Sequence, residues 1–397
     1  MKIKPSHRLE LLPPYLFGKI NALKYAKRRA GVDIIDLGMG NPLDPTPRPV
    51  VDKLCEAVQD PRNHRYSSAT GIFNLKREVA TVYRNRHGVE LDPAEEILCT
   101  IGSKEGFSHL CLALVGAGDL ILVPQPSFPI HTYSVLLANG EVVGFPLAGE
   151  EEMVREVDRL ARNLLPKPKG LILNFPHNPT TRCVSLDFYH EITRVARRHR
   201  IFIISDLAYG ATAFDGYEPP SLLQAKYGKD VGVEFTTMSK EFNMAGWRVG
   251  YCVGNKSAVA ALATIKGYYD YGIFQPVQIA SIIAMRHCAD EAAEQRGRYQ
   301  RRRDVLCSGL EKAGWEVEWP KATMFAWVKI PPPYNRLGSV KFAMELMEKA
   351  NVAAAPGAGF GLAGEGYLRL ALVENEKRLQ QAIRQIRRAF PVTGADR

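Results

Sequence analysis

The stretch "VEFTTMSKEFNMAGWRVGYCVGN", residues 233 to 255, contains two β-rich runs separated by a lysine, Lys240. The first run ends directly before Lys240, and Ser239 and Arg248 flank it. A lysine on its own is most often a solvated surface group. Whether Lys240 is instead the amine on which a reaction depends must be decided from the rest of the chain.

The two runs belong to a series between about residues 95 and 255, in which short β-rich segments alternate with helix-period segments. Most of the β-rich runs are continuously apolar, which indicates strands buried on both faces. Residues 185–200, opened by Ser185 as an N-cap, predict one of the helices between them. This alternation predicts a doubly wound α/β sheet, whose ligands bind beyond the carboxyl ends of the strands. The strand candidates are "EILCTIG", "LILVPQP", "EVVGFPL", "GLILNFP", "IFIISDLAYG", "VEFTTMS" and "VGYCVGN".

The 397 residues exceed the usual size of one domain. After about residue 300 the pattern changes to a smaller α+β unit, with "GWEVEWP", "MFAWVKIP" and "GYLRLALV" between helices. The Pro-rich opening and "DIIDLGMGNPLDPTP" are expected to pack with that unit. We therefore expect an N-terminal arm at 1–45, a large domain at 46–290 and a small domain at 291–397.

Composition excludes several classes of protein. Hydrophobic residues make up 46% of the chain and charged residues 24%, which is typical of a globular protein. No segment approaches the roughly 20 apolar residues that span a bilayer, and we expect a cytoplasmic protein without membrane contact. The seven scattered cysteines predict neither a disulfide framework nor a metal site. The net charge is +10, and its densest basic run is "RGRYQRRRD" (296–304), where a solvated helix face is favoured over a nucleic-acid surface.

Four strand-end segments carry polar groups, and each alone has an ordinary explanation. "TIGSKEG" (100–106) predicts an anion-binding helix N-terminus, or simply a capped turn. Asn178 in "LILNFPHNPTT" could be only a turn residue. Asp206 closes an apolar strand with Tyr209 close behind it, and a buried carboxylate needs a partner. These groups, Lys240 and Arg248 are expected along one row of strand ends.

Together and in order, these motifs resemble the fold-type I pyridoxal 5′-phosphate (PLP) aminotransferases of class I/II. The resemblance covers nearly the whole chain, and the family implies a mostly parallel seven-stranded sheet in the large domain. The sequences of these motifs are most similar to those of the glutamate:pyruvate (alanine) aminotransferases and the LL-diaminopimelate aminotransferases. The motifs that carry it are "LPPYLFGK", "DLGMGNP", "HRYSSATG", "GSKEG", "NFPHNPT", "SDLAYG", "SKEFNMAGWRVG" and "YLRLALVEN".

The resemblance implies a catalytic role for three residues. Lys240 would bond the cofactor aldehyde and, once released, move the proton between substrate and cofactor. Asp206 would pair with the pyridine nitrogen. Tyr209, together with Asn178, would hydrogen-bond the phenolic oxygen of the ring.

The remaining implied residues bind cofactor phosphate, ring or substrate. Arg369, with Gly40 and Asn178, would bind the substrate α-carboxylate, although an arginine on an alternating strand could otherwise face solvent. Tyr66 would reach the phosphate across a homodimer interface. The phosphate and ring contacts are assigned to Ser103, the backbone of Lys104, Ser239, Arg248 and, stacked on the ring, Phe128.

Two positions depart from the family pattern. Thr181 stands where "NPTG" has glycine, so the backbone of this loop could differ. Phe128 stands where the subgroup often has tyrosine. The substrate therefore stays open between alanine with glutamate, preferred, and LL-diaminopimelate, aspartate, methionine or aromatic amino acids. A PLP-dependent C–S β-lyase is a further alternative, and a DNA-binding regulator is disfavoured because no room is left for a DNA-binding module.

Overall fold

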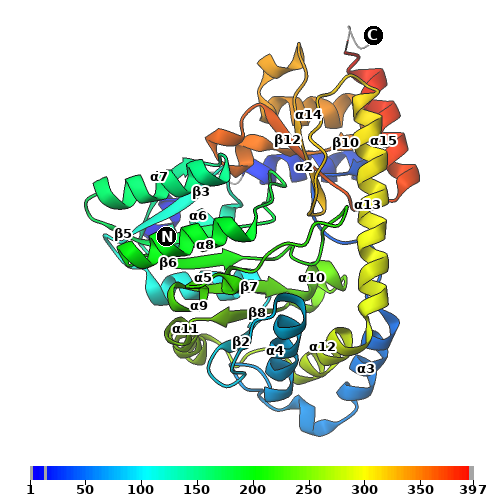
Figure 1. Ribbon diagram of the computed structural model, residues 1–397. Helices are drawn as coiled ribbons and strands as arrows, with labels where there is room; N and C mark the ends of the chain where they lie inside the picture. The colour runs from blue at the N-terminus through cyan, green and yellow to red at the C-terminus, as the bar shows by residue number, and fades with distance from the viewer. Residues whose placement is uncertain (1–2, 13–15, 393–397) are drawn as a thin grey trace.

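The computed structural model describes residues 3–12 and 16–392, so Pro13, Pro14 and Tyr15 of the "LPPYLFGK" motif lie outside the described residues. In Figure 1 the chain forms a large sheet-containing part and a smaller part above it. A cavity opens between segments of the two, as described below. Within the described ranges, no helix is both long enough and apolar enough to cross a membrane.

The central sheet has seven strands in the order β2-β8-β7-β6-β5-β3-β4. All pairs are parallel except those of β8, which runs antiparallel to both neighbours. The predicted mostly parallel α/β sheet is confirmed, and each of the seven apolar runs forms a strand. The strands are β2 (Ile97–Ile101), β3 (Leu120–Gln125), β4 (Glu141–Pro146), β5 (Pro168–Asn174), β6 (Phe202–Asp206), β7 (Gly232–Thr237) and β8 (Val249–Gly254).

Helices cover both faces of this sheet, which explains the continuously apolar strands. Leu171 and Leu173 of β5 belong to the core formed with α7 (Glu150–Asn163) and α8 (Leu186–His199), while Ile172 faces the core beneath α5 (Ser103–Leu114) and α11 (Lys256–Tyr269). The predicted N-cap is present, since Ser185 Oγ accepts a hydrogen bond from Phe188 N. The other helices of this part are α3 (Arg48–Val58), α4 (Phe73–His87), α6 (Pro129–Leu137), α9 (Gly228–Val231), α10 (Met238–Glu241) and α12 (Gln275–His287).

The smaller part contains a three-stranded antiparallel sheet, β11-β12-β9, and helices on its outer side. The predicted run "GWEVEWP" is not a strand: only Val317 bridges to Val328. Pro320, which lacks a backbone N–H, closes the run and cannot extend a ladder. The elements are α13 (Ala289–Glu311), β9 (Phe325–Lys329), α14 (Ser339–Ala350), β10 (Val352–Ala353), β11 (Ala355–Pro356), β12 (Tyr367–Ala371) and α15 (Glu376–Ala389).

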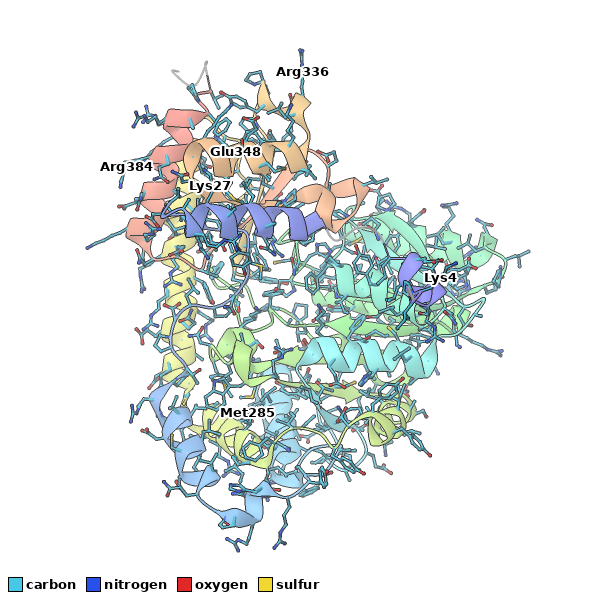
Figure 2. The ribbon with its side chains drawn as sticks, turned by 180° about the vertical axis from the view of Figure 1, so that it is seen from behind. Lys4, Lys27, Met285, Arg336, Glu348 and Arg384 are labelled. Carbon is cyan, nitrogen blue, oxygen red and sulfur yellow. The ribbon has the colours of Figure 1, made fainter. Side chains whose placement is uncertain are left out.

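The N-terminal segment joins the smaller part. Strand β1 (Ile35–Asp36) pairs in parallel with β10, and α2 (Leu16–Arg29) lies along α14. Figure 2 shows Lys27 of α2 beside Glu348, and Lys27 Nζ donates to the Glu348 carbonyl at 3.0 Å. The short helix α1 (His7–Glu10) precedes α2 in the chain. We keep the division into 1–45, 46–290 and 291–397 as a proposal.

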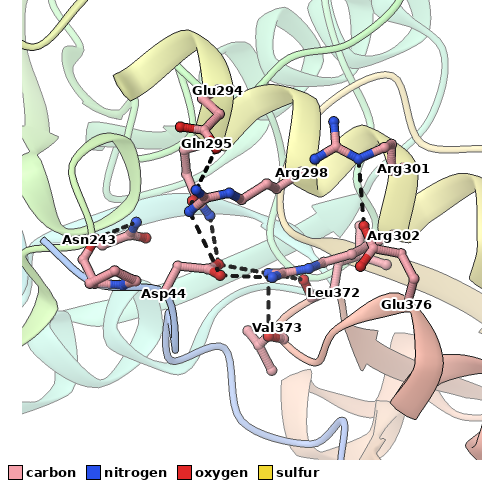
Figure 3. A network of polar contacts seen from close by, with 11 residues as sticks. Asp44, Asn243, Glu294, Gln295, Arg298, Arg301, Arg302, Leu372, Val373 and Glu376 are labelled. Carbon is pink, nitrogen blue, oxygen red and sulfur yellow. Dashed lines mark hydrogen bonds and ion pairs between the residues drawn. The ribbon is translucent and has the colours of Figure 1, made fainter. Parts of the chain in front are cut away.

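Helix α13 runs from the large part to the smaller one, and Asp44 fastens the N-terminal segment to it (Figures 1 and 3). The Arg302 guanidinium donates to both Asp44 oxygens, at 2.7 and 2.8 Å, and to the carbonyls of Leu372 and Val373. Gln295 donates to the same carboxylate at 3.0 Å. Three segments distant in sequence are therefore held together directly beside the end of β12.

Candidate active site

The predicted site residues gather in one cavity of about 720 Å³ at the carboxyl ends of the parallel strands. Residues of the N-terminal segment and of the small sheet close it from the other side, because β1 and β12 bring them there. The cavity is lined by Gly40, Ser103, Lys104, Phe128, Asn178, Asp206, Tyr209, Ser239, Lys240, Arg248 and Arg369, which are all the predicted site residues except Tyr66.

Lys240 lies on the short helix α10, directly after β7. Its Nζ donates to the Gly40 carbonyl at 2.8 Å. Burial, together with the positive charges of Arg369 and Arg248, lowers the pKa of the amine to about 8. An amine with this pKa is partly uncharged near neutral pH, so it can act as nucleophile and as base.

Asp206 ends β6 and is fixed on both oxygens. Oδ2 lies 2.9 Å from His131 Nε2, which must carry the hydrogen because a carboxylate only accepts, and Oδ1 accepts from Ala208 N at 3.2 Å. The register of the sheet places Asn174 opposite Asp206, and its Nδ2 donates to the Asp206 carbonyl at 2.7 Å. A buried carboxylate is thus held ready for a cationic partner.

Asn178 connects two other site residues. Its Nδ2 donates to the Tyr209 hydroxyl at 3.4 Å, and its Oδ1 accepts from Arg369 Nη1 at 2.8 Å. Asn174 Oδ1 accepts from the backbone N of Asn178 and so fixes this loop. Burial raises the pKa of Tyr209. Tyr209 therefore stays a protonated hydroxyl that can donate a hydrogen bond.

Arg369 is 6% exposed and lies between two aromatic rings, with its guanidinium carbon 4.0 Å from the Phe325 centroid and 4.7 Å from that of Phe360. Burial lowers its pKa to about 10. No carboxylate of the described chain forms an ion pair with it, and its buried Nε has no hydrogen-bond partner there. A desolvated guanidinium with a spare donor fits an anionic group from outside the chain.

The start of α5 and the segment around Arg248 form an anion-binding end of the cavity. Gly102, at φ +74°, precedes Ser103, whose backbone N–H and that of Lys104 open the helix. Its positive φ favours glycine, and a Cβ here would lie 2.8 Å from the Arg248 guanidinium carbon, so glycine lets the guanidinium approach the helix start without strain. Ser239 is 5% exposed beside this end and accepts from Thr237 Oγ1.

The two residues that depart from the family pattern behave differently. Thr181 is 6% exposed and has φ +64°, the left-handed conformation that glycine adopts without strain. Thr181 therefore holds a strained backbone conformation that glycine would adopt freely. Phe128 lies at the start of α6 with its ring edge-on to His131, at 5.9 Å between centroids.

Tyr66 does not reach the cavity of its own chain. It is 85% exposed and contacts Tyr271, with ring centroids 4.6 Å apart.

Sequence reasoning missed the two groups that fix Asp206 and Asn178. His131 lies inside the apolar helix "PIHTYSVLL" rather than at a strand end, and nothing local distinguishes it from a core histidine. Asn174 could have been found, because it ends β5 as Asp206 ends β6, and parallel neighbours meet at the same edge.

Comparison with known proteins agrees with this geometry. Residues 32–386 match the family "Aminotransferase class I and II". The chain is 48% identical over 390 residues to the glutamate–pyruvate aminotransferase AlaC of Escherichia coli K12, covering 98% of this chain and 94% of that protein. It is 40% identical to an LL-diaminopimelate aminotransferase of Moorella thermoacetica, over 98% and 99% of the two chains. Substrate-bound BacF of Bacillus subtilis superposes with a TM-score of 0.91 at 33% identity over 98% of each chain.

The chain therefore belongs to the class I and II aminotransferases, of fold type I. Its cofactor is PLP, on which this class depends. The predicted family, fold and cofactor are confirmed.

The residues present fit PLP. The cofactor has an aldehyde, a basic ring nitrogen, a phenolic oxygen and a phosphate; the cavity offers the Lys240 amine, the Asp206 carboxylate, the Tyr209 hydroxyl and the helix start beside Arg248. Gly102 leaves space for the Arg248 guanidinium beside this helix start.

The lowered pKa of Lys240 makes the stability of the cofactor-free protein depend on pH. The unfolded chain keeps this lysine protonated up to its ordinary value of 10.5, whereas the native amine loses its proton near pH 8. Between these values the unfolded state binds more protons, so stability rises with pH. Urea titrations should show the free energy of unfolding of the wild type rising, relative to Lys240→Met, by about 2 kcal/mol from pH 8 to pH 10. A difference that stays flat over this range would show that Lys240 is not the desolvated amine described here.

Proposed function

We propose that glutamate and alanine are the amino donors of this aminotransferase, with pyruvate and 2-oxoglutarate as acceptors, in a ping-pong cycle. The proposal rests on one observation. A single cavity contains the Lys240 amine, whose pKa is lowered, and the Arg369 guanidinium, which forms no ion pair with a carboxylate of the described residues. The 48% identity to a protein named glutamate–pyruvate aminotransferase supports the choice of substrates.

We infer the chemistry of each residue from its contacts. When bound, PLP supplies an aldehyde that takes up the amino group and a ring that accepts the electrons released at Cα. Lys240 Nζ removes the proton from the substrate Cα. The Asp206 carboxylate, which His131 orients, would hold the ring nitrogen of the cofactor and favour its protonated form. The Tyr209 hydroxyl, with Asn178 beside it, would hold the phenolic oxygen.

The anionic ends are assigned in the same way. We assign the cofactor phosphate to Ser103, the Lys104 backbone, Ser239 and Arg248, and the ring face to Phe128. Arg369 binds the substrate α-carboxylate, with Asn178 and the backbone at Gly40 beside it.

Arg369→Ala should raise KM for every amino acid and 2-oxo acid by about 100-fold or more, because it removes a charged and buried pair of hydrogen bonds. The visible absorbance of the bound cofactor should persist, since Arg369 is not assigned to the cofactor. Arg369→Lys, which keeps the charge and loses the fork, should recover only part of the loss. If both variants lost the cofactor, the assignment of Arg369 to the substrate carboxylate would be wrong.

We also propose a homodimer in which Tyr66 contacts the cofactor phosphate of the other subunit. In support, large aromatic side chains are exposed at Tyr66 and along residues 268–274, where the Tyr271 ring contacts that of Tyr66, and exposed apolar groups of this kind can mark an interaction surface. Mixing the variants Lys240→Ala/Arg369→Ala and Tyr66→Phe should give more activity than either variant alone, because one site of the mixed dimer then contains no substitution. No recovery, or a monomer in light scattering, contradicts the proposal. The exposed residues are Tyr66, Tyr268, Tyr269, Tyr271 and Phe274.

Half-reactions test the function itself. Glutamate, and separately alanine, should convert the aldehyde form of the bound cofactor to its amine form, and pyruvate or 2-oxoglutarate should restore it. LL-diaminopimelate is the second candidate, supported by the 40% identity to an LL-diaminopimelate aminotransferase, and belongs in the same panel with aspartate, methionine and phenylalanine. Release of pyruvate and a thiol from cystathionine without an acceptor would favour the C–S lyase instead.

A further inference from the structure

A buried ion pair at the edge of the active-site cavity has none of the roles assigned above. Lys24 of α2 donates through Nζ to Asp36 Oδ2 at 2.7 Å, and both residues line the cavity. The side chains are only 5% and 15% exposed. Arg28, one turn further along α2, stays 3.8 Å from the same oxygen and is half-exposed, so Lys24 is the main partner of the carboxylate.

The second oxygen of Asp36 reaches toward the substrate site. Oδ1 accepts from the backbone N of Gly38 at 3.1 Å, and the Gly38 carbonyl accepts from Arg369 Nη2 at 3.2 Å. A continuous series of hydrogen bonds therefore joins the amine of Lys24 to the guanidinium of Arg369.

The same segment also contacts the other reacting end of the site. Two residues after Gly38, the Gly40 carbonyl accepts from Lys240. Gly40 packs closely on the Phe325 ring, since a Cβ at Gly40 would lie 2.6 Å from ring atoms. The Arg369 guanidinium lies over the same ring. The position of residues 38–40 therefore sets the orientation of Arg369 from two sides.

We propose that Lys24 is a positioning residue for substrate binding: through Asp36 and Gly38 it orients Arg369 for the α-carboxylate that all substrates share. The proposal rests on the role proposed for Arg369. Lys24 acts in two ways. It holds the carboxylate so that Oδ1 stays on Gly38, and it neutralises a negative charge that would otherwise repel the incoming α-carboxylate.

The test is the steady-state kinetics of Lys24→Met with glutamate, alanine, pyruvate and 2-oxoglutarate. KM should rise by about tenfold for all four substrates, as expected when a charge-assisted hydrogen bond is lost, while kcat and the cofactor absorbance change little. Lys24→Arg should restore most of the affinity. Lys27→Met is the matched control: Lys27 lies on the same helix but does not line the cavity, and its Nζ donates instead to the Met347 and Glu348 carbonyls of α14. Its substitution should leave KM unchanged.

Three outcomes overturn the proposal: wild-type KM values in Lys24→Met, an equal rise in Lys27→Met, or a rise confined to glutamate and 2-oxoglutarate. The last would mean that Lys24 contacts the second carboxylate of those two substrates. If Lys24→Met does not fold, the double variant Lys24→Met/Asp36→Asn avoids leaving the Asp36 charge without its lysine. Its KM should also rise for all four substrates, by a smaller factor. Failure of the half-reactions, or wild-type KM values in Arg369→Ala, would instead contradict the proposed function, whichever way Lys24 behaves.

Discussion

Replacing Lys240 with alanine should lower the rate of transamination by at least about 10⁴-fold, because one change removes both the nucleophile for the cofactor aldehyde and the base for Cα. The visible absorbance of the lysine-bound cofactor should disappear even when PLP is added in excess. Spectra and single-turnover rates with glutamate measure the two effects separately.

The matched control is Lys104→Ala. Lys104 lines the same cavity with an exposed side chain, but only its backbone N–H is assigned a role. Its substitution should keep the absorbance and lose less than about tenfold in rate, as surface changes usually do. Retention of the absorbance in Lys240→Ala would assign the covalent bond to another lysine.

Asp206→Asn should lower kcat by about 10³-fold while the cofactor stays bound. The amide is nearly the same size but carries no charge, so it no longer stabilises a protonated ring nitrogen, and removal of the Cα proton becomes harder. Deuterium at the substrate Cα should then slow the reaction more than it does in the wild type, which a comparison of α-deuterated and ordinary glutamate measures.

Two further variants separate charge from position at Asp206. Asp206→Glu restores the charge and should recover part of the rate. His131→Gln keeps a donor for the carboxylate and should lie between the wild type and Asp206→Asn, because His131 only orients it. Nearly wild-type kcat in Asp206→Asn would show that the ring nitrogen is stabilised elsewhere.

Much of the fold could be predicted because the sheet is covered on both faces. Most strands then become apolar runs, as in β5, where Leu171 and Leu173 belong to one core and Ile172 to another. The run "GWEVEWP" misled because alternating charge and aromatic residues satisfy a strand pattern, yet Val317 finds only an isolated bridge. Local patterns report which residues suit a strand, and not whether a partner edge is available.

Site residues could be predicted from the sequence where they lie at strand ends, but not where their role depends on contacts between distant segments. Asp206 ends β6, and Asn178 and Lys240 lie just beyond the ends of β5 and β7, so the topology of the sheet brings them together. His131 and Lys24 lie inside helices, and their partners Asp206 and Asp36 are identified only by the folded chain. Thr181 shows a further limit: the departure from glycine was visible, but its strained φ of +64° was not.

The most direct test of the account is the location of the covalent bond to the cofactor. The holoenzyme is reduced with borohydride, which converts the bond between PLP and its lysine to a stable amine, then digested and analysed by mass spectrometry. The account predicts the added mass on Lys240 and on no other lysine of the cavity, so Lys24 and Lys104 stay unmodified. Stoichiometric label on any lysine other than Lys240 would contradict it.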